Sequence, residues 1–256
     1  MSAPEDPRVA RARAWRDASH VAVCDALTPW AGGTVVRASR YPTYWYYNAV
    51  RVERDTGMSC AELIAFADEA LDGLAHRKID FDDVAQAERL RGEFDAADWQ
   101  SRRLVLMRHE TATSLSSPHT VEEVPFDATE PLRVAWHNED FPGVPPDRHL
   151  EDERELAGRR GDRILAVVEA GNAVGFSQLL TSGTAAEVTD VYVDSVHRGA
   201  GIGTALTLGA IELAAGAQDL WILADDEDRP KELYKRLGFR PVWCFMRFLR
   251  LPHARS

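Results

Sequence analysis

A strand, a group of glycines and a helix follow one another around the segment VYVDSVHRGAGIG, residues 191–203. Val191, Tyr192 and Val193 are typical of a strand, and from Thr204 the pattern is helical. Glycine lacks a Cβ and can take positive φ, so a ligand can approach the main chain closely. Because amides at a helix N-terminus are unpaired and carry partial positive charge, this junction predicts a phosphate or pyrophosphate site.

Two familiar phosphate-binding motifs do not fit this junction. The P-loop requires a lysine after its last glycine, and none follows here. The dinucleotide fingerprint GxGxxG requires a glycine three residues after its second, but Gly199, Gly201 and Gly203 are two apart and Thr204 occupies that place. Glycine spacing therefore argues against a nucleotide-binding α/β domain of either kind.

A third motif does fit. Arg198-x-x-Gly201-x-Gly203 follows the pattern [QR]-x-x-G-x-[GA] of the GCN5-related N-acetyltransferases (GNAT superfamily). The segment KELYKRLGF, residues 231–239, is similar to the LY-x-x-x-GF of a late helix in that superfamily. Residues 121–250 also resemble it in the order of elements. The resemblance implies the α/β fold of acyl-CoA N-acyltransferases, a mixed, mostly antiparallel central sheet flanked by helices.

By this resemblance the ligand is acetyl-CoA, used as a cosubstrate. The loop amides would hold its pyrophosphate, with Arg198 near a phosphate, and the main chain of Val191 and Val193 would pair with the pantetheine arm. The Val191 amide would also polarise the thioester carbonyl. The residues expected to bind the cosubstrate are Val191, Tyr192, Val193, Arg198, Gly199, Ala200, Gly201, Ile202, Gly203 and Thr204.

Acetyl transfer to an amine needs a base for the ammonium proton and an acid for the leaving thiolate. The resemblance favours Glu187 as the base, eleven residues before Arg198 on the central strand. Asp190 is the alternative, although a regular strand would direct it to the opposite face, and a base acting through water is a third option. Tyr234 stands at the family's tyrosine position and is the expected acid. The competing interpretations are an exposed acid at a strand end for Glu187 and a packed aromatic for Tyr234.

One departure from the family concerns the segment before Tyr234. The family often has Asn and Ala there, where this chain has Glu227 and Pro230. Proline is acceptable in the first turn of a helix, but the missing Asn removes one expected hydrogen bond to the pantetheine arm. The acids at 225–228 are expected to lie in a solvated loop.

These features predict an acetyl-CoA-dependent N-acetyltransferase. It would transfer the acetyl group to a primary amine directly, in a ternary complex, because the central strand contains no cysteine for a covalent intermediate. A small metabolite is favoured over a protein as the acceptor. The alternative is a non-catalytic module that binds or senses acyl-CoA, which would retain its ligand without turnover.

The Ser/Thr-rich segment TATSLSSPHT, residues 111–120, reads as a linker between two domains. We expect a degenerate GNAT-like domain without the glycine loop at 1–115 and a catalytic GNAT domain at 120–256. The strand, helix, strand pattern of 76–110 recurs at 219–250, which suggests two tandem copies of the fold. The alternative is that any such unit has this pattern. The aromatic run at 41–53 is expected to be core.

Charge and cysteine content limit the partners. Lys and Arg total 30 against 41 Asp and Glu, and a net charge of −11 does not favour binding to nucleic acid or anionic membranes. Three distant cysteines indicate neither a disulfide framework nor a zinc site, and no metal is expected. Without a signal peptide or membrane span, the chain is expected to be cytoplasmic, and its preference for Arg over Lys suggests a GC-rich bacterial source. It would be a monomer with pseudo-dimeric halves or a homodimer.

Overall fold

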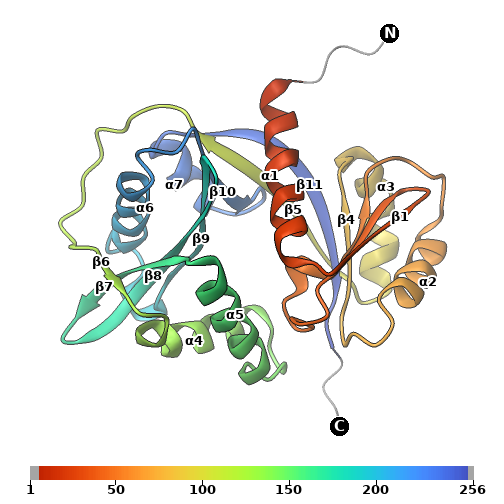
Figure 1. Ribbon diagram of the computed structural model, residues 1–256, viewed down its shortest axis with the longest axis horizontal. Coiled ribbons are helices and arrows are strands. Elements are labelled where there is room, and N and C mark those ends of the chain that lie inside the picture. Colours follow the sequence, from red (N-terminus) through yellow and green to blue (C-terminus); the bar gives the residue numbers. More distant parts are fainter. Residues whose placement is uncertain (1–5, 253–256) are drawn as a thin grey trace. The chain divides into compact units, whose positions relative to one another are not determined.

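The computed structural model describes residues 6–252, and the chain forms two compact units (Figure 1). Unit 1 contains residues 6–105, Asp225–Glu227 and 242–252. Unit 2 contains Leu106–Ala224 and Asp228–Pro241. Each unit has its own sheet strands and its own helices, and the two are described separately below.

Unit 1 is a sheet with helices on both faces (Figure 1), and its strands are ordered β1-β2-β3-β4-β11-β5, with only the first part of β5 belonging to it. Ser59 and Glu62 form a capping box at the start of one helix, and Asp83 caps the next. The elements are α1 (Pro7–Val23), β1 (Ala26–Trp30), β2 (Gly33–Arg37), η1 (Trp45–Tyr47), β3 (Ala49–Val52), α2 (Cys60–Ala70), β4 (Arg77–Phe81), α3 (Val84–Ala96), the first part of β5 (Gln100–His109) and most of β11 (Phe239–Arg250).

The hydrophobic core of unit 1 lies between its sheet and helices α2 and α3. Val50 and Val52 of β3, with Ile79 and Phe81 of β4, are fully buried in it. Phe248 of β11 completes this core and stacks on a ring of α3. The aromatic run at 41–53 is buried at three of its rings, which confirms that it belongs to the interior: Tyr41, Trp45 and Tyr47.

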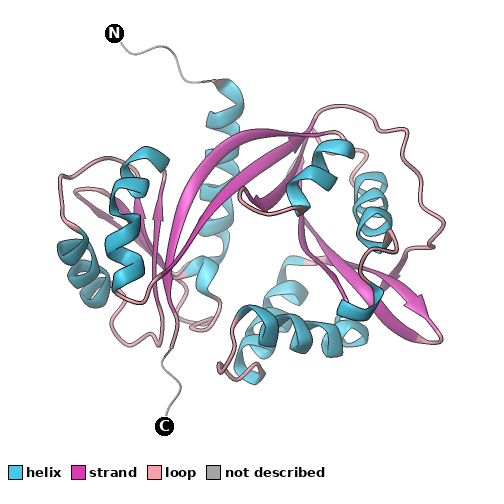
Figure 2. Ribbon diagram, turned by 180° about the vertical axis from the view of Figure 1, so that it is seen from behind, coloured by secondary structure: helices cyan, strands magenta, loops and turns pink. Residues whose placement is uncertain are grey.

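Unit 2 also has helices on both faces of its sheet, with α6 on one face and α4 and α5 on the other (Figure 2). Its strands are ordered β5-β10-β9-β8-β7-β6. The elements are β6 (Glu122–Val124), η2 (Phe126–Thr129), α4 (Glu130–Asp140), α5 (Asp147–Arg160), β7 (Arg163–Glu169), β8 (Asn172–Ser182), β9 (Ala185–Val193), η3 (Ser195–His197), α6 (Ile202–Leu213), β10 (Asp219–Asp225) and α7 (Pro230–Arg236).

The two halves of the chain repeat one succession of elements. In the first, β2 pairs antiparallel with β3, and β4 follows α2 and pairs parallel with β3. In the second, β8 pairs antiparallel with β9, and β10 follows α6 and pairs parallel with β9. A helix and a long strand complete each series, as α3 and β5 or as α7 and β11. This agreement supports the tandem arrangement and confirms the mixed, mostly antiparallel sheet.

The final strand of each repeat, β5 or β11, pairs with strands that belong to the other repeat. The second part of β5 is the neighbour of β10 in unit 2, and β11 pairs antiparallel with β4 in unit 1, with Met246 opposite Phe81. A single cut near 115–120, as expected from the linker, therefore does not separate the units. The composition of the linker indicates where the second repeat begins. It does not indicate that β5 will lie beside β10, or that β11 will pair with β4.

Candidate acyl-CoA site

The glycine loop, defined here as residues 198–204, connects β9 to α6 through two residues in left-handed conformations. Gly199 has φ +82° and Gly201, the N-cap of α6, has φ +89°. A Cβ built on either would meet no atom within 4 Å, so both open onto free space. The first amides of a helix have no acceptor within it, so those of α6 are available to a ligand. The loop therefore fits a pyrophosphate group in shape and in chemistry.

The sheet opens beside this loop. The parallel pairing of β9 with β10 ends where Val188 lies opposite Ile222, yet the strands continue to Val193 and Asp225. The main chain of β9 beyond Val188 is therefore not paired with β10. Val191 and Val193, the residues expected to pair with the pantetheine arm, lie in this stretch. An extended ligand could add there as a strand does.

Arg198 anchors the start of the loop. Its Nε donates to the Val193 carbonyl at 3.1 Å, and its Nη2 donates to Glu139 of α4 at 2.6 Å. The hydroxyl of Tyr192 donates to the same carboxylate at 2.8 Å. The hydrogen bond from Arg198 lowers the pKa of Glu139, and burial, with that carboxylate, raises the pKa of Tyr192 to about 12. In this arrangement Arg198 holds the loop to the strand end, whereas a phosphate contact was expected.

His119 is a contact that the sequence did not suggest. Its Nε2 donates to the carbonyl of Ala200 at 2.8 Å, which joins the linker to the middle of the glycine loop. Thr113 and Thr111 of the same linker contact the carbonyls of Arg236 and Gly238, at 3.2 and 3.5 Å. The Ser/Thr-rich segment is therefore attached to unit 2 at several points.

The two candidate bases lie on β9 in different settings. Glu187 is 7% exposed and sits where β9 is paired on both sides, opposite Leu180 and Trp221. Asp190 has φ +55° and lies in a β-bulge, because Phe176 pairs with Tyr192 while Gln178 pairs with Thr189. The strand is therefore not regular between the two acids, and the face expected for Asp190 from period-two alternation does not apply. Burial raises the pKa of Asp190.

Tyr234 lies on α7, next to the start of α6. A Cβ on Gly203 would be 3.6 Å from Leu233 and 3.9 Å from Val193, so α7, the glycine loop and the end of β9 meet at this point. Tyr234 is 6% exposed, and burial raises its pKa to about 12. Its ring makes an edge contact with Phe239. The Tyr234 side chain can therefore pack in the interior of unit 2 and still lie close to the glycine loop.

A buried network of charged and polar side chains, here called the Arg133 network, was missed by sequence reasoning. Arg133 of α4 pairs with Glu153 of α5 and donates to Gln178 of β8 at 3.0 Å. Gln178 in turn donates to Asp162 at 2.8 Å. Burial, and then the nearby Asp190, raise the pKa of Glu153 to about 7. Charged groups on α4 and α5 therefore interact electrostatically with Asp190 in the bulge.

Two of the acidic residues before α7 form ion pairs with arginines of unit 1. Glu227 pairs with Arg91 at 2.8 Å, and Asp226 pairs with Arg103 at 2.8 Å. Glu227 stands where the family often has Asn, and its carboxylate is engaged by a guanidinium. Pro230 begins α7, in the first turn where proline is tolerated.

Comparisons with known proteins concern the fold of the segment that carries the glycine loop. Residues 160–241, which include β7 to α7, match the family model described as an acetyltransferase (GNAT) domain. This part of unit 2 is therefore similar to a GNAT acetyltransferase domain, and the likeness supports an acyltransferase that uses acyl-CoA. None of the curated proteins matches the sequence.

Two solved structures resemble nearly the whole chain. A GCN5-related N-acetyltransferase from Kribbella flavida is 15% identical with a TM-score of 0.52, and the match covers 93% of this chain and 94% of that one. A functionally unknown conserved protein from Staphylococcus epidermidis ATCC 12228 is 14% identical with a TM-score of 0.61, covering 90% and 94%. At these identities the likeness concerns the fold. No helix within residues 6–252 is long and apolar enough to cross a membrane.

Proposed function

We propose that this protein is an acetyl-CoA-dependent N-acetyltransferase that acts on a primary amine, with a small metabolite as acceptor. The observation that carries the proposal is the glycine loop, where two left-handed glycines face open space at a helix N-terminus. The end of the β9–β10 pairing beside it supports an extended pantetheine arm. Anion binding and strand-like pairing are the two properties that acyl-CoA requires together.

The proposed reaction is direct transfer. The ammonium form of the acceptor loses a proton to Glu187, with Asp190 as the alternative base, and the neutral amine nitrogen then attacks the thioester carbonyl. The amide of Val191 would stabilise the oxyanion. As the C–S bond breaks, Tyr234 would give its proton to the leaving thiolate, and the nitrogen of the intermediate would lose its second proton, which restores the Tyr234 hydroxyl directly or through water. All three cysteines of the chain, Cys24, Cys60 and Cys244, belong to unit 1, which supports a route without an acetyl-cysteine in unit 2.

A calorimetric titration with acetyl-CoA tests the proposal. Gly201→Glu would place a carboxylate where the pyrophosphate lies, and we expect affinity to fall by about tenfold or more. Gly216→Glu is the matched control, because a Cβ at Gly216 also meets open space but lies beyond the other end of α6. If the parent does not bind acetyl-CoA, or if both variants bind it equally well, the proposal is wrong.

A non-catalytic acyl-CoA-binding module is the second candidate. The pairing of Glu227 with Arg91 favours it, because no amide is available at the position where the family's Asn would contact pantetheine. Turnover separates the two. Release of free CoA thiol with any member of a panel of primary amines identifies an enzyme, whereas binding without release across the panel identifies the module.

A further inference from the structure

The sheet of unit 1 has one apolar face and one charged face. Val50, Val52, Ile79 and Phe81 point into the hydrophobic core, while the alternate residues of the same strands point toward α1. Those alternate residues include Arg51, Lys78 and Asp80, which are all buried. Burying charges is costly unless they are paired, and an apolar face would cover a helix more stably. The charged face therefore calls for an explanation beyond packing.

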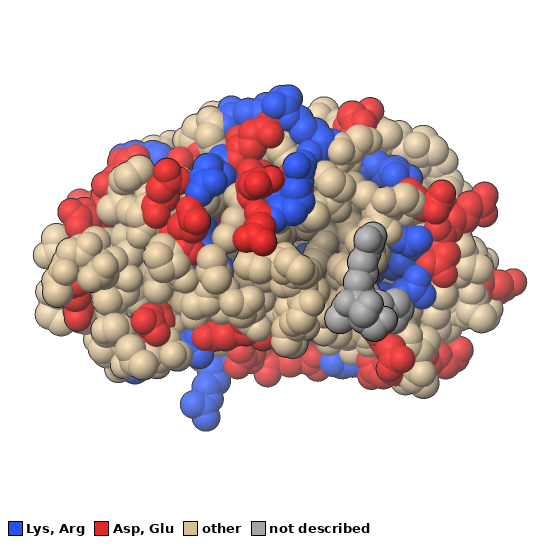
Figure 3. Space-filling model, turned by 90° about the horizontal axis from the view of Figure 1, so that it is seen from below, with Lys and Arg blue, Asp and Glu red and all other residues tan. Residues whose placement is uncertain are grey.

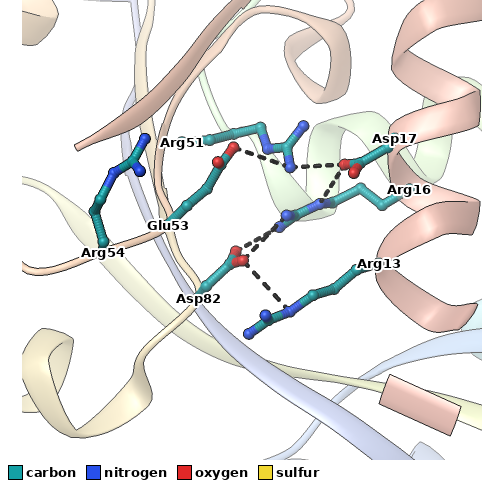
Figure 4. Close-up of a pocket in the computed structure, with 7 residues that line it drawn as sticks. All are labelled: Arg13, Arg16, Asp17, Arg51, Glu53, Arg54 and Asp82. Carbon is teal, nitrogen blue, oxygen red and sulfur yellow. Dashed lines mark hydrogen bonds and ion pairs between the residues drawn. The ribbon is translucent and has the colours of Figure 1, made fainter. Parts of the chain in front are cut away.

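A pocket of about 270 Å³ lies between this face and α1 (Figure 4). Side chains of α1 form one side of it, and side chains from β3, the segment after β3 and the end of β4 form the other. All of its lining residues belong to unit 1. They are Arg13, Arg16, Asp17, Arg51, Glu53, Arg54 and Asp82.

The carboxylates of the pocket do not neutralise all of its arginines. Asp82 is shared by two guanidiniums, with Arg16 at 2.7 Å and Arg13 at 3.6 Å. Arg51 contacts Asp17 at 2.7 Å and Glu53 at 3.1 Å, and Arg16 Nε lies 3.8 Å from the same Asp17 carboxylate. Four arginines thus face three carboxylates in the lining. The pocket carries an excess of positive charge in a chain whose net charge is −11.

Several donors of these arginines have no acceptor. Arg16 and Arg51 are 4% and 5% exposed, and the Nε of each is buried without a hydrogen bond, although Arg16 Nε makes a long ion pair with Asp17 at 3.8 Å. The guanidinium of Arg54 has neither a hydrogen bond nor an ion pair to any residue between 6 and 252. A guanidinium is donor-only, so a ligand that satisfies these groups must supply acceptors. Carboxylate and phosphate oxygens are acceptors that match its geometry.

The electrostatic environment around the pocket is also positive. The pKa of His20 is held well below its ordinary value, first by burial and then by Arg51, Arg16 and Lys78. Elsewhere, in the view of Figure 3, basic and acidic side chains are interspersed over the surface. The pocket therefore differs from that surface in having buried, convergent arginines.

We propose that the unit 1 pocket binds a small oxyanion, a carboxylate or phosphate group of a metabolite. The carboxylates of Asp17, Glu53 and Asp82 would hold the guanidiniums in place, and Arg54 and Arg13 would close on the ligand. A volume of about 270 Å³ leaves room for a small molecule rather than for a single water. The glycine loop belongs to unit 2, so this site and the proposed acetyl-CoA site share no residue.

Calorimetric titrations with inorganic phosphate and with succinate, at constant ionic strength set by chloride, test the proposal. Arg54→Gln removes an unpaired guanidinium from an exposed side chain, so the fold is expected to persist. We expect it to weaken binding by about tenfold or more, as for the loss of a charge-assisted hydrogen bond. Arg11→Gln is the matched control, because Arg11 is exposed, is two residues from Arg13 on α1, and does not line the pocket.

The outcomes separate the sources of the anion. Saturable binding of phosphate alone identifies a phosphoryl ligand, and binding of succinate alone identifies a carboxylate ligand; either supports the proposal if Arg54→Gln weakens it and Arg11→Gln does not. The Gly201→Glu variant should bind the same anion as the parent, because the change is in unit 2. No saturable binding of either anion, or equal weakening by Arg54→Gln and Arg11→Gln, would overturn the proposal.

Discussion

Replacing single glycines by alanine around the start of α6 should separate backbone strain from packing. Gly201 has φ +89°, and its Cβ would meet no atom within 4 Å. The cost of Gly201→Ala is therefore conformational alone, about 1–2 kcal/mol for an L-residue in a left-handed conformation. At the size of this chain, that lowers the melting temperature by roughly 2–8 °C.

Gly203 is the matched site. It lies inside α6, and its Cβ would meet Leu233 at 3.6 Å and Val193 at 3.9 Å, which are ordinary van der Waals contacts. Alanine in a helix is more stable than glycine by roughly 0.5–1 kcal/mol, so Gly203→Ala should keep or raise the melting temperature. Acetyl-CoA affinity should fall in Gly201→Ala, because the loop amides lose their alignment.

Differential scanning calorimetry and calorimetric titration of the two variants give the result. The reasoning is refuted if Gly201→Ala keeps both the parental melting temperature and the parental affinity, since the left-handed conformation would then not be required. It is also refuted if Gly203→Ala is as destabilised as Gly201→Ala, since packing rather than backbone conformation would then control the loop.

Four further predictions concern unit 2. Tyr234→Phe should lower kcat by about 10²-fold with unchanged acetyl-CoA affinity, and an unchanged kcat in steady-state assays would exclude the hydroxyl as the acid. Glu187→Gln and Asp190→Asn should differ in the pH profile of kcat/KM: the variant that removes the base loses the acidic limb, and retention of that limb in both would exclude both carboxylates. Arg133→Met leaves Glu153 buried without its cation and should lower the free energy of unfolding by about 3–5 kcal/mol in urea titrations at pH 8. The double variant with Glu153→Leu should recover much of that loss. Equal stability of the single and double variants would contradict the ion pair. For Glu153 itself, a pKa raised from 4.5 to about 7 means that the folded chain holds more protons than the unfolded chain, so this group's contribution to the free energy of unfolding falls as pH rises through that window. Glu153→Gln should flatten this dependence in urea titrations at several pH values.

The glycine loop and its neighbouring helices could be predicted because local chemistry determines them. The spacing of Gly199, Gly201 and Gly203 indicated a strand–helix junction, and positive φ at the first two follows from glycine alone. The helix at Asp147–Arg160 ends at Gly161, where a glycine in the left-handed region terminates it. Helix α6 ends at Leu213, three residues before Gly216, the next residue at which a helix would ordinarily stop, because pattern alone does not fix a helix end to within a few residues.

The bulge and the Arg133 network could not be predicted from one sequence. Period-two alternation assumes a regular strand, and the residues around Asp190 contain no sequence signal for the extra residue that forms the bulge. The helix that contains Glu153 is rich in charged residues, which is typical of a solvated helix. Only the packing of α4 and α5 on the sheet places Glu153 and Arg133 inside. The pocket in unit 1 is similar, because its arginines come from two segments distant in the sequence, α1 and the end of β3, and converge only in the fold.

The exchange of final strands has a consequence for synthesis on the ribosome. Unit 1 needs β11 to complete its core, since Met246 and Phe248 are buried among residues of β3, β4 and α3. These residues are made only after all of unit 2, and at about 5–20 residues per second they follow Val105 by roughly 10–30 s. During that interval the edge of β4 that later receives β11 is open to other chains. The amino-terminal half is therefore the first to be translated and the last to be closed, and a ribosome that stalls within unit 2 would leave it as an aggregation-prone intermediate.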